Sequence, residues 1–189
     1  MDAFVEDQTF ETIDFKAKPP AKGHYDHCTF LHCDLSSVNL SEIIFVDCVF
    51  TGCNLSMAAV SATVFRDVRF GECKMLGMRF DQASMFGLAC GFGGCILDHS
   101  SFYAMKMKKT NFSRCQLRQV DFTGCDLSQA VFDGCDLADA VFERTVLEKA
   151  DLRGAFNYSI DPAGNRVKKA RFSLEGVRGL LGKYDILIE

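Results

Sequence analysis

The stretch FSRCQLRQVDFTGCDLSQAVFDGCDLADAVFERTVL, residues 112–147, places a large apolar side chain at every fifth position. These central residues alternate between phenylalanine and leucine, and a smaller side chain such as Cys115 or Ala130 stands two places before most of them. Residues two apart in an extended chain point to the same side, so each group of five offers one large and one small side chain to an interior. An α-helix does not fit, because steps of five residues turn by about 500° and scatter the apolar set around the helix. The stretch therefore predicts short extended segments joined by turns.

The same period of five runs through most of the chain, from Phe10 to Leu152. The first register extends to Met85, and the pattern resumes at Leu97 after a shift of two residues. After residue 102, phenylalanine alternates with an aliphatic residue as the central residue. Like residues stack on like, and each layer keeps the same volume, only if each turn has an even number of sides. Four is the smallest even number of sides that encloses an interior. We therefore predict an all-β solenoid of four-sided turns, stacked about 4.8 Å apart by backbone hydrogen bonds.

Composition excludes few classes of function. The net charge of −4 and the pI near 5.6 provide no overall basic surface for direct nucleic-acid binding. The N-terminal residues MDAFVEDQTF are acidic and lack the basic and apolar regions of a secretory signal, so a cytoplasmic protein is expected, with its ten cysteines reduced and no membrane association.

The units CDLSS, VNLSE, CNLSM, VDFTG, CDLSQ, CDLAD and ADLRG, found between residues 33 and 154, resemble those of the pentapeptide-repeat family. The resemblance implies a right-handed quadrilateral β-helix. Within the family, FLHCDLSSVNLSEIIFVDCVF (30–50) and CNLSMAAV (53–60) are similar to the quinolone-resistance (Qnr) proteins. Qnr proteins are dimers that bind DNA gyrase and topoisomerase IV and shield them from quinolones, so the resemblance implies a non-enzymatic binding protein. The sequence lacks the long inserted loops that Qnr proteins usually carry.

Two segments depart from the repeat and divide the chain into a β-helix over 1–154, with a break at 86–96, and a C-terminal cap over 155–189. In the break, the glycine-rich segment LACGFGG (88–94) predicts either a loop that contacts a partner or a corner adjustment between two halves, and we favour the adjustment. In the cap, 156–160 and 166–172 have the pattern of two short strands around the turn 161–165, and Ser173 is a candidate N-cap for a following helix.

The cap is also expected to prevent the exposed last turn from polymerising. Its apolar residues exceed what one end of the rod can cover, which predicts a homodimer formed through this segment, as the Qnr resemblance also implies. The candidate cap and dimer residues are Phe172, Leu174, Val177, Leu180, Leu181, Tyr184, Ile186 and Ile188.

The stretch HYDHCTFLHC, residues 24–33, contains three histidines and two cysteines, the side chains that zinc prefers. In the register of the repeat, Cys28 and Cys33 point inward on adjacent sides, whereas His27 and His32 fall at corners. The side chains therefore do not converge, and we predict no metal site and no cofactor. Nine of the ten cysteines take inward positions and are interpreted as small apolar groups stacked in the core rather than as disulfides. Cys90 lies off the pattern and is the one candidate for a reactive thiol.

We find no catalytic motif in the sequence, and Asp126 and Asp136, ten residues apart, are expected on opposite sides of the rod. An excess of acidic residues in the later turns is instead a candidate partner-binding face, because pentapeptide-repeat proteins have been proposed to mimic DNA. The set comprises Asp121, Asp126, Asp133, Asp136, Asp139, Glu143, Glu148 and Asp151. The leading functional hypothesis is a Qnr-like protein that interacts with type II topoisomerases. The alternatives are a scaffold for another partner and an enzyme that uses Cys90.

Overall fold

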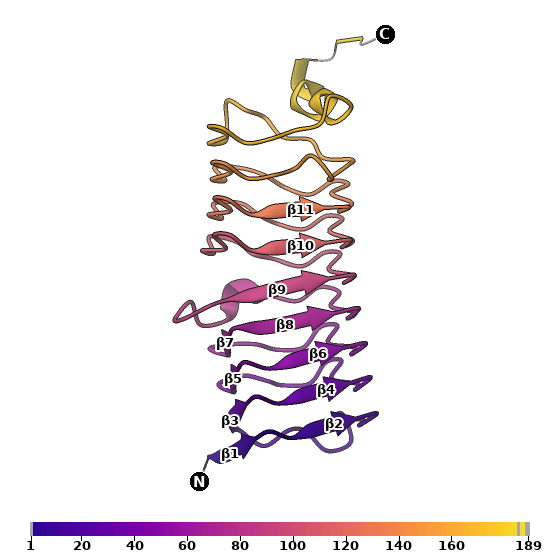
Figure 1. Cartoon of the computed structure of the whole chain (residues 1–189), viewed down its shortest axis with the longest axis vertical. Coiled ribbons are helices and arrows are strands. Elements are labelled where there is room, and N and C mark those ends of the chain that lie inside the picture. Colours follow the sequence, from indigo (N-terminus) through magenta and orange to yellow (C-terminus); the bar gives the residue numbers. More distant parts are fainter. Residues whose placement is uncertain (1, 185, 188–189) are drawn as a thin grey trace.

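The computed structural model describes residues 2–184 and 186–187, and it is a four-sided rod whose successive turns stack in parallel (Figure 1). The first side is a seven-stranded sheet with one strand per turn, in the order β2, β4, β6, β8, β9, β10, β11. The fourth side begins as a four-stranded sheet of β1, β3, β5 and β7. The strands are β1 Ala3–Glu6, β2 Thr9–Glu11, β3 Gly23–Asp26, β4 Thr29–Leu31, β5 Ile44–Val46, β6 Val49–Thr51, β7 Val64–Arg66, β8 Val68–Gly71, β9 Cys90–Gly93, β10 Asn111–Ser113 and β11 Val131–Asp133.

The other two sides are held by isolated parallel bridges between successive turns. The second side contains the bridges from Asp14 through Asp34 and Asn54 to Phe156, and the third contains those of 39 with 59 and of 101 with 121. The corners are formed by residues two places after each central residue, which have left-handed backbone angles, such as His27 and His32, each with a φ of 51°. Most of the register steps are 20 residues, as four sides of five require.

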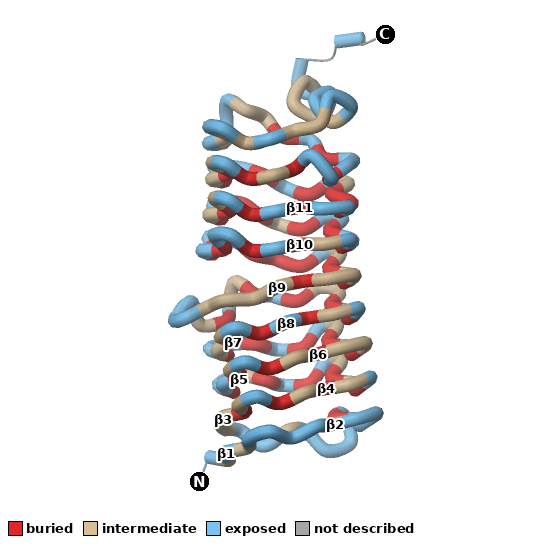
Figure 2. Tube along the Cα trace, in the orientation of Figure 1, coloured by how far each residue is buried: buried red, intermediate tan, exposed pale blue. Residues whose placement is uncertain are grey.

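The interior contains the central residues and the residues two places before them, as the period of five predicts, and Figure 2 shows the buried positions recurring on every turn. Phe112 is fully buried and stacks between Phe92 and Phe132, with ring centroids 5.1 and 5.0 Å apart. It also contacts Phe102 and Phe122 edge to face. The predicted alternation therefore places phenylalanines on opposite sides of each later turn.

In the earlier turns, phenylalanine takes adjacent sides instead. Phe45 on the fourth side meets Phe50 on the first side of the same turn edge to face, at 5.4 Å. From Phe80 onward, the second aromatic column lies on the third side, where Phe80 stacks on Phe102 at 4.7 Å. Each turn keeps two aromatic rings through this exchange, so that the interior volume of the rod stays constant.

The exchange occurs at a two-residue insertion, which lies earlier than predicted. Ser84 N–H donates to Thr63 O, a separation of 21 residues, whereas Ile96 N–H donates to Cys73 O, a separation of 23. The longer step is already present in β9, where Cys90 pairs with Val68, 22 residues before it instead of 20. The intervening residues 85–88 form the loop that projects from the rod before β9 (Figure 1). The prediction of Met85 as an inward central residue is wrong: its side chain is 58% exposed.

The glycine-rich segment predicted to interrupt the repeat continues it instead. β9 pairs with β8 and β10, and Phe92 occupies the first-side stack. Cys90 is therefore not off the pattern, since it stands two places before Phe92 and in register with Val68. The glycines of β9 misled the sequence interpretation because backbone pairing needs no side chain, so a strand flanked by well-formed neighbours tolerates them.

The C-terminal segment continues the rod further than predicted. The segments 156–160 and 166–172 form no hairpin; they continue the solenoid, with Phe156 bridging Asp136 and Arg171 bridging Asp151. The turn below supplies the reason, because its donors need acceptors, and Leu147 N–H and Leu152 N–H bond to Arg166 O and Arg171 O at 2.8 Å.

The predicted C-terminal helix is replaced by short 3₁₀ segments. These are Gly176–Leu180 (η2) and Gly182–Tyr184 (η3), and a third 3₁₀ turn, Phe80–Gln82 (η1), precedes the projecting loop. Ser173 does accept a hydrogen bond at its Oγ from Gly176 N–H, at 3.0 Å, in the manner of an N-cap.

Candidate partner-binding surface

The eight carboxylates predicted as one acidic face lie on all four sides of the rod. Asp133 and Asp151 are on the first side, Asp136 is on the second, Asp121 and Glu143 are on the third, Asp126 and Glu148 are on the fourth, and Asp139 is at a corner, with a φ of 58°. Asp126 and Asp136 fall in different columns, as expected. Successive members of the set stand three to seven residues apart, which moves each carboxylate to another side or corner of the rod. A local excess of acidic residues in the sequence therefore does not become a continuous surface.

Half of these carboxylates are also paired with a basic side chain. The pairs are Asp126 with Lys108 at 3.3 Å, Asp136 with Arg118 at 2.6 Å, Glu148 with Arg166 at 2.7 Å and Asp151 with Arg153 at 2.7 Å. Burial would raise the pKa of Asp136, but hydrogen bonds from Asn157 Nδ2 and Arg118 Nε outweigh it and hold the pKa below its ordinary value. Paired carboxylates present less charge to a partner than isolated ones do.

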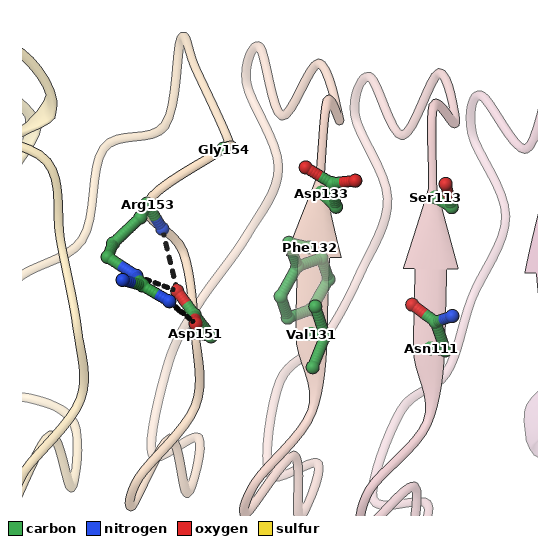
Figure 3. A pocket seen from close by; sticks show the side chains of 8 residues that line it. All are labelled: Asn111, Ser113, Val131, Phe132, Asp133, Asp151, Arg153 and Gly154. Atoms are coloured by element: carbon green, nitrogen blue, oxygen red, sulfur yellow. Dashed lines mark hydrogen bonds and ion pairs between the residues drawn. The ribbon is translucent and has the colours of Figure 1, made fainter.

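Two of the acidic residues meet at a shallow groove on the first side, with a volume of 540 Å³ (Figure 3). The lining residues are Asn111, Ser113, Val131, Phe132, Asp133, Asp151, Arg153 and Gly154. Arg153 folds back onto Asp151, with its Nε 2.9 Å from Oδ1, and this hydrogen bond lowers the pKa of Asp151. Among the described residues, no lysine or arginine nitrogen lies within 4.0 Å of the Asp133 carboxylate.

The groove has room for its present shape because residue 154 is a glycine and has no side chain. A Cβ at that position would lie 2.7 Å from Oδ1 of Asp133 and 3.0 Å from the backbone nitrogen of Gly134. The polar groups in the groove are a free carboxylate, an amide, a hydroxyl and a paired guanidinium, which together can hydrogen-bond to the surface of a partner. Asn111 and Ser113 were not among the predicted partner-binding residues, because that prediction used charge and both are uncharged. The feature of the sequence that could have identified them is that both are polar residues at outward positions of the first side.

The predicted cap and dimer residues divide into two groups. Phe172 and Leu180 pack against the core, and Leu181 is half-buried. Outward-facing members are Leu174 (85% exposed), Val177, Tyr184 and Ile186, and Leu187 beside them is also exposed. Ile188 lies outside the described residues. The end of the rod is thus covered by the first group, while the second group leaves apolar surface open.

Nine of the ten cysteines are buried in the interior, and Cys90 is half-buried. Cys28 and Cys33 are buried, and all ten cysteines are free thiols. One column on the second side continues through the insertion and contains six of them: Cys33, Cys53, Cys73, Cys95, Cys115 and Cys135. Cys53 Sγ, for example, donates to Phe30 O at 3.3 Å. Burial raises the pKa of the Cys90 thiol, so it is protonated at neutral pH and lacks the thiolate that a nucleophile requires.

The period, the four-sided turns and the stacked core define a pentapeptide-repeat β-solenoid. A family model described as "Pentapeptide repeat region" matches residues 24–90 and 78–152, and the chain belongs to this family. No curated sequence matches the chain at a significant level.

Among solved structures, a trypsin-treated variant of QnrB1, a plasmid-mediated fluoroquinolone resistance protein, superposes with a TM-score of 0.65 at 16% identity. The match covers 98% of this chain and 96% of that one. Full-length QnrB1 gives a TM-score of 0.51 at 17% identity, covering 96% of this chain and 99% of that one. HetL, a pentapeptide-repeat protein involved in heterocyst differentiation in Nostoc sp. strain PCC 7120, gives 0.43 at 18% identity, covering 88% and 86%. The two likenesses to QnrB1 show a shared fold. No helix among the described residues has the length and apolar character needed to cross a membrane.

Proposed function

We propose that this chain is a non-enzymatic, Qnr-like binding protein that engages DNA gyrase or topoisomerase IV and protects it from quinolones. The observation that carries the proposal is the correspondence with QnrB1 over nearly the whole length of both chains, which includes the C-terminal segment as well as the repeats. The described part of the rod is filled along its interior and encloses no pocket in which a substrate would be surrounded, so we expect it to act through its outer surface. Recognition then depends on which side faces the enzyme.

The first-side groove is the part of the surface that we assign to this contact. Asp133 is exposed there and free of a basic partner, beside the hydrogen-bonding groups of Asn111 and Ser113. A type II topoisomerase presents a basic surface that binds DNA phosphates, and a carboxylate on a flat sheet can occupy a phosphate position. The other unpaired carboxylates lie on different sides and cannot contact the same surface at once.

A supercoiling assay with purified gyrase, with and without ciprofloxacin, tests the proposal. We expect the wild-type protein to restore supercoiling at micromolar concentration in the presence of the drug. Asp133→Lys should weaken the protection, whereas the matched Asp139→Lys at a corner away from the groove should not. Neither protection nor inhibition by the wild-type protein would remove the topoisomerase role; equal effects of the two variants would remove the groove from it.

We also propose a homodimer formed through the outward C-terminal residues. Leu174, Tyr184 and Ile186 expose apolar surface at the end of the rod, and a second copy related by a twofold axis would bury it. Analytical ultracentrifugation should give a dimer for the wild-type protein and a monomer for Leu174→Glu. Phe86→Glu, which charges an equally exposed apolar residue of the projecting loop, is the control and should remain dimeric. A monomeric wild-type protein would contradict the proposal.

A specific observation favours a second candidate, a scaffold for a different partner. The acidic residues are distributed over four sides and half of them are paired, so the rod does not present the continuous negative surface of a duplex. A scaffold of this kind would leave gyrase unaffected in the assay above while still forming the C-terminal dimer.

A further inference from the structure

The corner between the fourth and first sides carries an unusual column near the N-terminal end of the rod. Asp7, His27, Asp47 and Asp67 occupy the same corner of four successive turns, with φ values of 53°, 51°, 50° and 54°. Backbone hydrogen bonds fix the stack, for instance from His27 N–H to Val46 O at 3.0 Å. Stacked carboxylates repel one another, and the only basic side chain within the column is His27.

Asp26 and Asp47 bring their carboxylates to this histidine. One carboxylate oxygen of each and one ring nitrogen of His27 all lie within 4.8 Å of one another. His27 belongs to the same turn as Asp26, and Asp47 comes from the next turn. Among the described residues, no lysine or arginine nitrogen lies within 4.0 Å of either carboxylate, so the cluster contains two negative charges without a fixed cation.

Asp26 adds a second, independent observation. Its Oδ1 is buried and receives no hydrogen bond from the described residues. The same atom lies 2.7 Å from His27 Nδ1, and the Asp26 side chain as a whole is 23% exposed. A buried carboxylate oxygen without a donor is costly, and a metal ion would satisfy it.

We propose that Asp26, His27 and Asp47 form a binding site for a divalent transition-metal ion of the zinc class. Ligand atoms around a tetrahedral zinc ion stand about 3.3 Å apart, given bonds of about 2.0–2.1 Å. The 2.7 Å between Asp26 Oδ1 and His27 Nδ1 would have to widen to that distance, and the Asp47 carboxylate, which lies within 4.8 Å, would have to approach to it. His27 is exposed and free to make this adjustment. An imidazole among the ligands favours zinc over magnesium or calcium, which take oxygen ligands. The fourth position faces solvent and is open to water or to a partner's side chain.

The site differs from a cysteine–histidine site in the same stretch of sequence. Cys28 follows His27 directly, but its side chain points into the core and donates to Asp26 O. A metal ion at this corner would join two successive turns from outside, so it would stabilise the folded chain in proportion to its concentration relative to its dissociation constant.

Calorimetric titration of the full chain with zinc chloride tests the assignment, with His27→Asn and His32→Asn as a matched pair. Both histidines stand at corners with a φ of 51°, a conformation that asparagine accepts, so neither change disturbs the backbone. We expect one zinc ion per chain in the wild-type protein and in His32→Asn, and an affinity at least about tenfold lower in His27→Asn. Asp47→Asn, an exposed change, should give a similar loss.

Cobalt substitution identifies the ligand atoms. Bound Co²⁺ should show ligand-field absorption without the charge-transfer band of a thiolate ligand. Three results would overturn the proposal: no zinc binding by the wild-type protein, equal affinity in the two histidine variants, or a thiolate charge-transfer band, which would place the ion on the cysteines. Circular dichroism of each variant confirms that the comparison is made between folded proteins.

Discussion

Phe112→Ala should be among the most destabilising single changes in this chain. The side chain is fully buried, and removing a buried phenylalanine costs about 3–5 kcal/mol. Phe112 also makes two stacked and two edge-to-face ring contacts, each of which contributes about 0.5–1.5 kcal/mol beyond area burial. We therefore expect a loss near the upper end of the range, about 5 kcal/mol, which rivals the whole stability of many domains.

Urea unfolding followed by far-ultraviolet circular dichroism measures this loss, since the chain has no tryptophan to report by fluorescence. Phe156→Ala provides the control, because Phe156 is 48% exposed on an outward position, and we expect its removal to cost at most about 1 kcal/mol. The dependence of the unfolding free energy on urea concentration should be the same in both variants, so that the midpoints can be compared. A cost for Phe112→Ala no larger than that for Phe156→Ala would refute the description of the interior as a stack of rings.

Three further predictions follow from individual contacts. The hydrogen bond from Lys16 lowers the pKa of Asp34 to about 2. The ionised carboxylate therefore stabilises the fold above about pH 4, and this stabilisation is lost as the pH falls towards about 2. Between these pH values, the melting temperature of Asp34→Asn should fall less than that of the wild-type protein. Gly154→Ala should lower the free energy of unfolding, measured in urea, by about 1–3 kcal/mol, because its Cβ would lie 2.7 Å from a carboxylate oxygen of the preceding turn. A Cβ at Gly91 would have no atom within 4 Å, so Gly91→Ala should be neutral or slightly stabilising. Equal losses in the two variants would contradict this reasoning. The nine buried cysteines should react with a thiol reagent only slowly at neutral pH and completely in denaturant, because the folded rod keeps the reagent from their side chains; for Cys115, the hydrogen bond with Cys135 and burial also raise the pKa to about 12. Rapid labelling of more thiols in the native protein than the half-buried Cys90 would contradict the interior placement.

Only part of the proposed metal site could be predicted from the stretch 24–33. The repeat register correctly placed Cys28 in the core and His27 at a corner, which excludes a site that combines the two. The same reasoning gave no sign that Asp47, one turn away, meets His27 in space. Spacing by twenty residues becomes contact only when the turns stack in register, and Asp47 lies outside the stretch 24–33.

The amino-acid sequence by itself determined the four-sided turn and its interior. A period of five with a large residue and a small one two places apart gives short extended sides joined by turns. Layers of equal volume then require an even number of sides, and four is the smallest number that encloses an interior. What only the tertiary structure decided is where the two extra residues of the insertion go. Residues 85–88 leave the rod and β9 stays in it because the backbone groups of β8 and β10 require a partner between them. That choice leaves Met85 outside the rod and places Phe92 in the first-side stack. Hydrogen bonding between turns is insensitive to side-chain identity, and for that reason the sequence pattern could not reveal the position of the insertion.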